Sequence, residues 1–399
     1  MQPEASDAKA RRRIYLPWCV NEDALSELMA AGRRQNINSV SVYGCLRGIA
    51  PSGRPNDIVA SKRKELEGLI RHCREIGVAT TYLLNGLGYG SAAWPSDLLR
   101  WLRDSLHPSA VCLTELGLAR DLVALWPEVL IEISTIAGCL ESNQVNAFLS
   151  DPQIGPRVKA VCLHHDATSH NWPRTAEFAA WLLKRNVHPF VLVNESCMAS
   201  CPARESHYRL FGSRACMRHT KDFLDPFQVG CVLTRLMEPW TLLDLAGFLQ
   251  PSILADFTTK TGIKGFKLAG RSMPWEWVAN AFRHYADAQD PENIFDVVVF
   301  TTPFLDRWRM TSADLFYVES HAYRQIHTTM ASLTTVSQRR AFLKAEAVRL
   351  YQAGQLRVRD PGSEYTVRDG NMVLTKPGEY ASFLHSLRLK IADKGKKSG

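Results

Sequence analysis

Four cysteines lie close together in the second half of the chain, and thiolates can bind metals. Cys197 and Cys201 come first and Cys216 and Cys231 follow, which gives the spacing C-x3-C-x14-C-x14-C. Four thiolates can hold a tetrahedral zinc ion or an iron–sulfur cluster. Structural zinc sites usually contain C-x2-C pairs, because one tight turn then delivers two sulfurs, and this stretch contains none. The longer, irregular spacing favours a cluster over zinc.

Two other interpretations apply to the same cysteines. A radical S-adenosylmethionine enzyme requires C-x3-C-x2-C, and Arg204 occupies the position of the third cysteine, which excludes that class. Four unrelated buried thiols are the structural alternative, since cysteine often serves as a small hydrophobic residue. That explanation fits the six other cysteines, which lie in apolar or helix-like surroundings: Cys19, Cys45, Cys73, Cys112, Cys139 and Cys162.

The elements that must position the four cysteines alternate between strands and helices from residue 14 to about residue 285. The candidate strands are Ile14–Cys19, Ser39–Gly44, Ala79–Gly86, Ala110–Glu115, Leu130–Thr135, Val158–His164, His188–Glu195 and Ile263–Gly270. This alternation predicts an α/β fold, a (β/α)8 TIM-like barrel. A doubly wound open sheet is the competing fold, and the lack of a G-x-G-x-x-G turn after any candidate strand favours the barrel.

The gap between the seventh and eighth candidate strands is far longer than one helix and two loops require, and it contains all four cysteines. A long insertion after a barrel strand lies on the catalytic face. The predicted organisation is a flexible N-terminus (1–13), a barrel (14–289) with a cluster-binding insertion (196–262), a C-terminal α+β extension (290–391) and a disordered tail (392–399). In the extension we expect a strand at 295–300, a helix at 338–353 and a hairpin within 354–374.

Polar residues near the predicted strand ends and beside the cysteines are candidates for catalysis and substrate binding, because barrel enzymes place such groups there. The catalytic candidates are Glu195, His164, Arg204 and His207. The substrate-binding candidates are Asn85, Glu115, Lys267 and Arg271. Lys267 and Arg271 suit a carboxylate or phosphate, with an ordinary salt bridge as the alternative. Arg204 and His207 are also candidates for hydrogen bonding to cluster sulfurs, with ordinary loop polarity as the alternative.

Composition bounds the partners of the chain. Among the 399 residues Lys and Arg number 48 and Asp and Glu 40, so the formal net charge is +8. That excess permits an anionic small molecule or RNA as partner without requiring either, and no RNA-binding module is visible. No apolar run approaches the roughly 20 residues of a membrane span, and the N-terminal stretch lacks the pattern of a secretory signal. The expectation is a cytoplasmic protein, whose cysteines are not structural disulfides.

The stretch VNESCMASCPARESHY, followed by two more cysteines and by GIKGFKLAGRSMPWEWV, resembles the peptidase U32 family. Weaker similarity lies in SVYGCLRGIAPSGRP, TYLLNGLGYG and LIEISTIAG, so the resemblance covers about residues 14–290. It implies a barrel with a [4Fe–4S] cluster on Cys197, Cys201, Cys216 and Cys231. It also implies O₂-independent hydroxylation of a ring, in a ubiquinone precursor or in bases of tRNA or ribosomal RNA, with prephenate as an oxygen source in the RNA cases. The peptidase activity of the family name finds no support, because the sequence lacks a Ser/His/Asp order and an H-E-x-x-H motif.

The predicted function is therefore an iron–sulfur enzyme that hydroxylates, or modifies by related redox chemistry, an aromatic or unsaturated small molecule or an RNA base without O₂. One alternative is a non-catalytic iron–sulfur subunit that transfers electrons or acts as a scaffold beside a paralogous barrel. Another is a zinc-stabilised peptidase-like protein. A homodimer or a heterodimer with a paralogous barrel is the expected kind of assembly. Iron, sulfide and zinc contents separate the zinc alternative from the other two.

Overall fold

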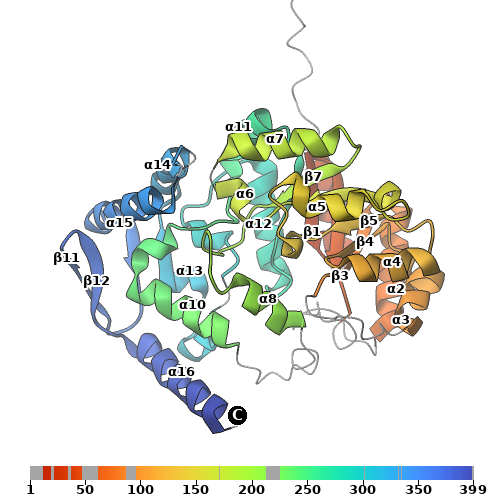
Figure 1. Ribbon diagram of the computed structural model, residues 1–399. Helices are drawn as coiled ribbons and strands as arrows, with labels where there is room; N and C mark the ends of the chain where they lie inside the picture. The colour runs from red at the N-terminus through yellow and green to blue at the C-terminus, as the bar shows by residue number, and fades with distance from the viewer. Residues whose placement is uncertain are drawn as a thin grey trace, which may run out of the picture.

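A computed structural model gives the fold of the chain (Figure 1). It describes residues 12–18, 22–34, 37–46, 62–86, 96–169, 171–212, 225–300, 302–330, 332–333 and 335–397.

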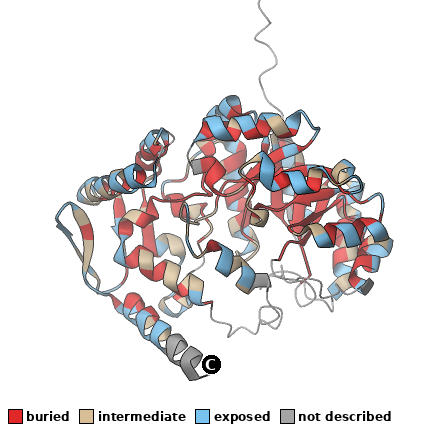
Figure 2. Ribbon diagram, in the orientation of Figure 1, coloured by how far each residue is buried: buried red, intermediate tan, exposed pale blue. Residues whose placement is uncertain are grey.

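Eight parallel strands in the described residues close into a barrel, in which each strand pairs with its neighbours along the chain and β8 pairs with β1. They are β1 (Arg12–Pro17), β2 (Ile37–Gly44), β3 (Ala79–Leu84), β4 (Ala110–Leu113), β5 (Ile131–Ile133), β6 (Val158–Cys162), β7 (His188–Leu192) and β8 (Gly265–Lys267). Most of their side chains are buried, as expected for strands covered on both faces (Figure 2). The predicted (β/α)8 TIM-like barrel is confirmed.

Helices surround the barrel and shield its outer face (Figures 1 and 2). The main ones are α1 (Glu22–Arg34), α2 (Arg63–Glu75), α3 (Ser96–Trp101), α4 (Leu116–Leu125), α5 (Ser142–Leu149), α6 (Asp166–Ser169), α7 (Trp172–Leu183) and α12 (Trp275–Asp287). Amphipathic segments explain this arrangement; on α2, for example, Leu66, Leu69, Ile70 and Cys73 face inward. Among the described residues, no helix has both the length and the apolar character needed to cross a membrane.

The long connection between β7 and β8 contains α8 (Arg204–Gly212), α10 (Pro226–Met237) and α11 (Leu254–Thr261). Helix α10 begins at a strong start signal, because the Asp225 carboxylate accepts hydrogen bonds from the amides of Phe227 and Gln228, and Pro226 occupies the first helical position. In Figure 1, α10 lies between the barrel and the C-terminal elements. The connection therefore links the barrel to the rest of the chain.

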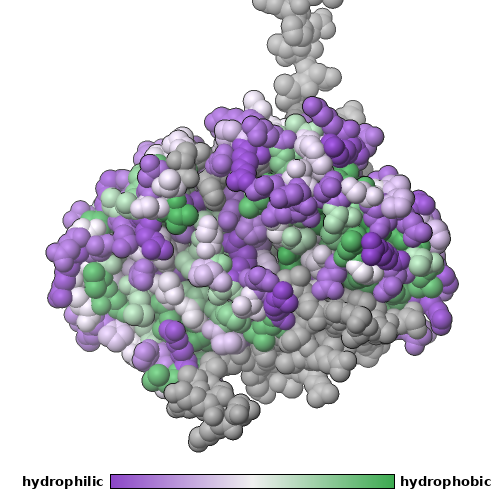
Figure 3. Space-filling view, viewed as in Figure 1, coloured by the Kyte–Doolittle hydropathy of each residue, from purple (hydrophilic) through white to green (hydrophobic). Residues whose placement is uncertain are grey.

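After α12 the chain adds α13 (Ser312–Leu315), β9 (Phe316–Val318), α14 (Ser320–Met330), α15 (Val336–Gln352), β10 (Leu356–Val358), β11 (Glu364–Arg368), β12 (Asn371–Lys376) and α16 (Glu379–Lys397). Strands β11 and β12 form an antiparallel hairpin, and β10 pairs with β9. Figure 3 shows hydrophilic side chains over much of the viewed face, with hydrophobic ones gathered near α10.

Three boundaries differ from the sequence predictions. The segment at 295–300 is not a strand: residues Ile294–Asp296 form a 3₁₀ turn, and Val299 makes only an isolated bridge to Glu195. Strand β1 begins at Arg12, inside the predicted N-terminal tail, because Arg12 and Arg13 pair with β2. Helix α16 continues to Lys397, into the stretch 392–397 that was expected to be a disordered tail. This stretch contains no proline, the residue that disfavours a helix most strongly.

Five of the six cysteines outside the metal-binding candidates are buried in the described structure: Cys45, Cys73, Cys112, Cys139 and Cys162. Cys19 lies outside the described residues. For these five, burial as small hydrophobic residues is confirmed.

His327 on α14 joins the C-terminal elements to the barrel and should make folding sensitive to acid. Its side chain is fully buried against Trp172 of α7, and burial lowers its pKa to about 4. Between pH 6.5 and about 4 the unfolded chain therefore binds a proton that the folded chain does not, so the free energy of unfolding falls by about 3 kcal/mol over that range.

We expect His327→Phe to flatten this part of the pH profile, measured by urea unfolding at pH 7 and pH 4.5. His385→Phe, a change at an exposed position on α16, should leave the profile as in the wild type. Equal pH dependence in the wild type and His327→Phe would contradict the assignment.

Candidate functional site

A cavity of about 870 Å³ lies at the carboxyl ends of the barrel strands. Residues at or just after those ends line it, among them Asn85 after β3, Thr135 after β5 and Lys267 at the end of β8. Cys197, Cys201 and Cys231 from the long connection line the same cavity. Val299 and Phe300, which follow α12, also contribute, so a segment assigned by sequence to the extension helps to form the cavity.

The predicted metal ligands are thus partly brought together. Cys197 and Cys201 lie on the loop before α8, and Cys231 comes from α10. Cys201 and Cys231 are near enough to Cys197 that their ionised forms would raise the pKa of its thiol. Cys216 lies outside the described residues.

Within the described structure, three donor atoms lie within 4.8 Å of one another, and they belong to His165, Glu195 and Cys197. A zinc ion bound by four thiolates would hold its sulfurs about 3.8 Å apart, given Zn–S bonds of about 2.3 Å in a tetrahedron. The expectation that the cysteine sulfurs converge within a few ångströms is therefore wrong for the described cysteines, since Cys201 and Cys231 do not join this group. The donor atoms that gather with the Cys197 sulfur are instead those of His165 and Glu195, which follow β6 and β7.

The protonation states of this group follow from burial. Withdrawal from water, with the Glu195 carboxylate nearby, raises the pKa of the Cys197 thiol to about 12. Burial, together with the charges of Arg204 and His164, lowers the pKa of His165 well below its usual value. At neutral pH the imidazole is therefore neutral, which is the form that binds metals, whereas the thiol must lose its proton when a metal binds.

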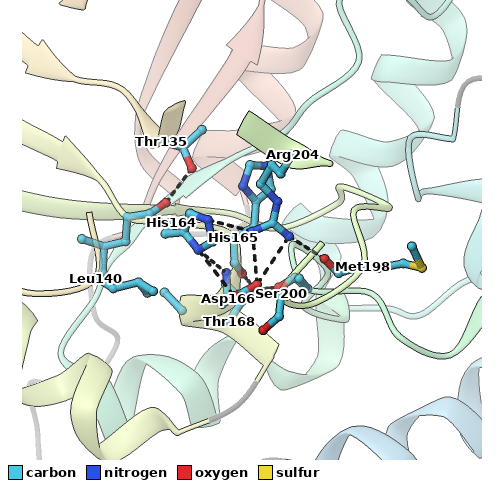
Figure 4. Close-up of polar contacts among 12 residues, drawn as sticks. Thr135, Leu140, His164, His165, Asp166, Thr168, Met198, Ser200 and Arg204 are labelled. Carbon is cyan, nitrogen blue, oxygen red and sulfur yellow. Dashed lines mark hydrogen bonds and ion pairs between the residues drawn. The ribbon is translucent and has the colours of Figure 1, made fainter. Parts of the chain in front are cut away.

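Arg204 fastens the cysteine loop to the end of β6 (Figure 4). Its guanidinium donates to His164 Nε2 at 2.7 Å, to the Met198 carbonyl and to Asp166 Oδ1 at 3.4 Å. Because a guanidinium can only donate, Nε2 of His164 is the acceptor of this contact. Nδ1 of the same ring accepts from the Asp166 amide at 3.3 Å and lies 3.7 Å from Asp166 Oδ2. Asp166 in turn accepts from the amide of Ser200, a residue held at φ 50°. This network fixes the loop between Cys197 and Cys201.

Two residues position Glu195. The preceding Asn194 is fully buried, and its side chain bonds to Ala269 and to the Val297 carbonyl, which fixes the exit of β7. Gly247 has no side chain, and its backbone carbonyl accepts a hydrogen bond from the Glu195 amide at 2.9 Å. A Cβ at Gly247 would come within 2.7 Å of the Glu195 Cβ, so only glycine permits this approach.

Of the other residues predicted for the site, some line the cavity and some do not. Lys267 lines the cavity with its ammonium 4.0 Å from the centre of the Tyr43 ring, and Arg271 lines it while donating to Cys45 Sγ at 3.4 Å. Asn85 also lines it and donates to Ser134 Oγ at 2.9 Å. His164 faces Arg204 and is not among the lining residues, and Glu115 is the N-terminal cap position of α4, also away from the lining.

His207 lines the cavity from α8, where its Nε2 lies 2.7 Å from Asp225 Oδ2. This contact joins α8 to the start of α10. Asp225 was not among the residues predicted for the site, although a D-P pair before an amphipathic run is a helix-start signal that identifies it.

Two further residues at the site were missed. Tyr208 stacks on His165 and its hydroxyl lies 3.2 Å from Nε2 of that ring. Arg235 contacts Cys231 Sγ at 3.4 Å from the same helix. The four-residue spacing between Cys231 and Arg235 places them on one face of a helix, a signal that was available in the sequence.

The fold and the site together define the class of protein: a closed parallel barrel with a candidate metal centre at its mouth. Thiols, a histidine and a carboxylate are the candidate ligands. The chain is 27% identical over 108 residues to the uncharacterized protease MJ1657 of Methanocaldococcus jannaschii, which covers 27% of this chain. The match spans 31% of that relative's length. No protein-family model matches the chain.

Among solved structures, the chain resembles the U32 peptidase Mk0906 with a TM-score of 0.44 and 15% identity, over 69% of this chain and 98% of that one. It also resembles a conserved Enterococcus faecalis protein of unknown function with a TM-score of 0.35 and 11% identity, over 69% of this chain and 65% of that one. The cysteine and FKLAGR segments resemble the peptidase U32 family, and the first of these solved structures is named a U32 peptidase.

Proposed function

We propose that the chain is an iron–sulfur enzyme that modifies an aromatic or unsaturated ring, in a small molecule or an RNA base, by O₂-independent hydroxylation or related redox chemistry. The observation that carries the proposal is that Cys197 and Cys201, from the loop before α8, and Cys231, from α10, line one cavity at the carboxyl ends of the barrel strands. With Cys216 they would hold a [4Fe–4S] cluster.

The chemistry of the donors supports such a group, since three of the four thiols line the cavity. Sulfur ligands suit iron–sulfur clusters, and the four protein thiolates around a cluster lie farther apart than four thiolates on one zinc ion. Arg204 and Arg235, both buried, supply positive charge beside the thiols. When bound, the cluster would supply one-electron redox chemistry or a site for a substrate oxygen.

The other residues of the cavity would bind and orient the substrate. Lys267 and Arg271 lie at the end of β8 and suit an anionic group, and Asn85 offers an amide from the end of β3. For a hydroxylation the balance is ring C–H plus donor C–OH giving ring C–OH plus donor C–H, so a hydroxylated organic cosubstrate provides the oxygen. The cavity volume of about 870 Å³ is large enough for a ring substrate.

Metal analysis of the wild-type protein, purified without oxygen, tests this proposal. We expect about four irons and four sulfides per chain, broad visible absorbance and an EPR signal after reduction. Stoichiometric zinc with no iron or sulfide would overturn it.

A second candidate is a mononuclear metal enzyme, favoured by the proximity of His165, Glu195 and Cys197. Three protein ligands and an open position are typical of catalytic zinc, which lowers the pKa of its bound water. Two variants separate the candidates. Glu195→Gln should remove a mononuclear ion and spare a cluster, whereas Cys201→Ala should remove a cluster and spare a mononuclear ion.

A further inference from the structure

Arg235 is a buried cation without a carboxylate partner. Its side chain has no exposed surface, and no described acidic group lies within ion-pair distance of it. Its Nε atom is buried and has no hydrogen-bond partner among the described residues. An uncompensated buried charge costs several kcal/mol, so a guanidinium in this position requires an anion nearby.

The contacts of Arg235 identify where that anion lies. Nη1 donates to Cys231 Sγ at 3.4 Å, and Nη2 donates to the carbonyl of Ser196, the residue before Cys197. The guanidinium carbon lies over the Phe300 ring, 4.9 Å from its centre, and the thiol of Cys231 is the ionisable group that the guanidinium contacts among the described residues. One side chain therefore contacts one proposed ligand and the backbone beside another.

The carbonyls around Cys197 are all fixed. That of Ser196 accepts from Arg235, that of Cys197 accepts from the Ala246 amide at 2.7 Å, and that of Met198 accepts from Arg204. Arg204 has the Asp166 carboxylate as its counter-charge, whereas the part of the chain that the structure describes offers no carboxylate to Arg235. Both arginines therefore donate to carbonyls of the cysteine loop, but of the two only Arg204 has a carboxylate partner among the described residues.

We propose that Arg235 is a positioning residue whose counter-anion is the metal–thiolate centre: it links Cys231 to the Cys197 loop and stabilises the more negative, reduced state of the centre. This inference rests on the iron–sulfur centre proposed above. Hydrogen bonds and positive charge at cluster sulfurs raise the reduction potential, because they favour the added electron.

The first test measures the midpoint potential of the holoprotein by EPR-monitored titration. Arg235→Met should shift the potential to more negative values, and Arg235→Lys, which keeps the charge, should shift it less. Arg339→Met is the matched control, because Arg339 is also buried but is paired with Asp244, and neither residue lines the cavity. A wild-type potential in both Arg235 variants would overturn the proposal.

The second test covers the case in which a variant loads poorly, and compares thermal unfolding before and after anaerobic reconstitution with ferrous iron and sulfide. Loading should raise the Tm of the wild type more than that of Arg235→Met, since only the wild type gains a counter-anion for a buried cation. Arg339→Met should lower both Tm values equally. An equal gain in the wild type and Arg235→Met would overturn the proposal, whereas a wild type that binds no iron would instead refute the proposed function.

Discussion

Replacing Cys197 by alanine is expected to abolish the metal centre, whereas replacing Cys112 by alanine leaves it intact. Cys197 belongs both to the predicted cysteine ligand set and to the group formed with His165 and Glu195, so its sulfur is needed in either arrangement. Loss of one thiolate from a four-thiolate set leaves an iron without its protein ligand. Iron and sulfide per chain and the visible absorbance should therefore fall to background.

Cys112 provides the matched control. It is fully buried in β4, and burial raises the pKa of its thiol to about 12, so it is an unreactive hydrophobic residue. The truncation should cost about 1 kcal/mol of stability and no metal. Cys201→Ala should resemble Cys197→Ala. Full iron and sulfide content in Cys197→Ala would remove this residue from the ligand set.

Replacing Arg204 by methionine is expected to lower the free energy of unfolding by about 3 kcal/mol or more, because it breaks a buried pair and leaves its partners behind. Asp166, with a side chain 11% exposed, would lose its buried counter-charge. His164 Nε2 and the Met198 carbonyl would lose their donor. The cysteine loop would no longer be held to the end of β6, so metal content should fall as well.

Arg209 lies on the same helix and serves as the control for Arg204. Its guanidinium pairs with Glu205 at 2.8 Å, and the two side chains are 61% and 71% exposed. Exposed pairs of this kind contribute about 0.5 kcal/mol or less. Urea unfolding of Arg204→Met and Arg209→Met, made in parallel, measures the difference. Losses of similar size in the two variants would show that the Arg204 network does not stabilise the loop.

The alternation of apolar strands and amphipathic helices was enough to predict the barrel, because a parallel strand covered on both faces leaves a clear hydrophobic run. The prediction failed at 295–300, where an apolar run of strand length forms a 3₁₀ turn and an isolated bridge. A short apolar run shows burial but not conformation, and here the contact with Glu195 after β7 decides the local backbone.

Sequence by itself determined the residue types at the mouth of the barrel and their order along the chain. A window with four cysteines, a histidine pair after one strand and a glutamate after the next can be read without coordinates. Spacing along the chain gives no distance between side chains on different elements. Only the tertiary structure decided that His165 and Glu195 gather at Cys197, that Arg204 pairs with Asp166, and that Arg235 is buried against Cys231 with no carboxylate from the described residues beside it. These contacts join β6, β7, α8 and α10, and packing of those elements rather than any local pattern brings them together.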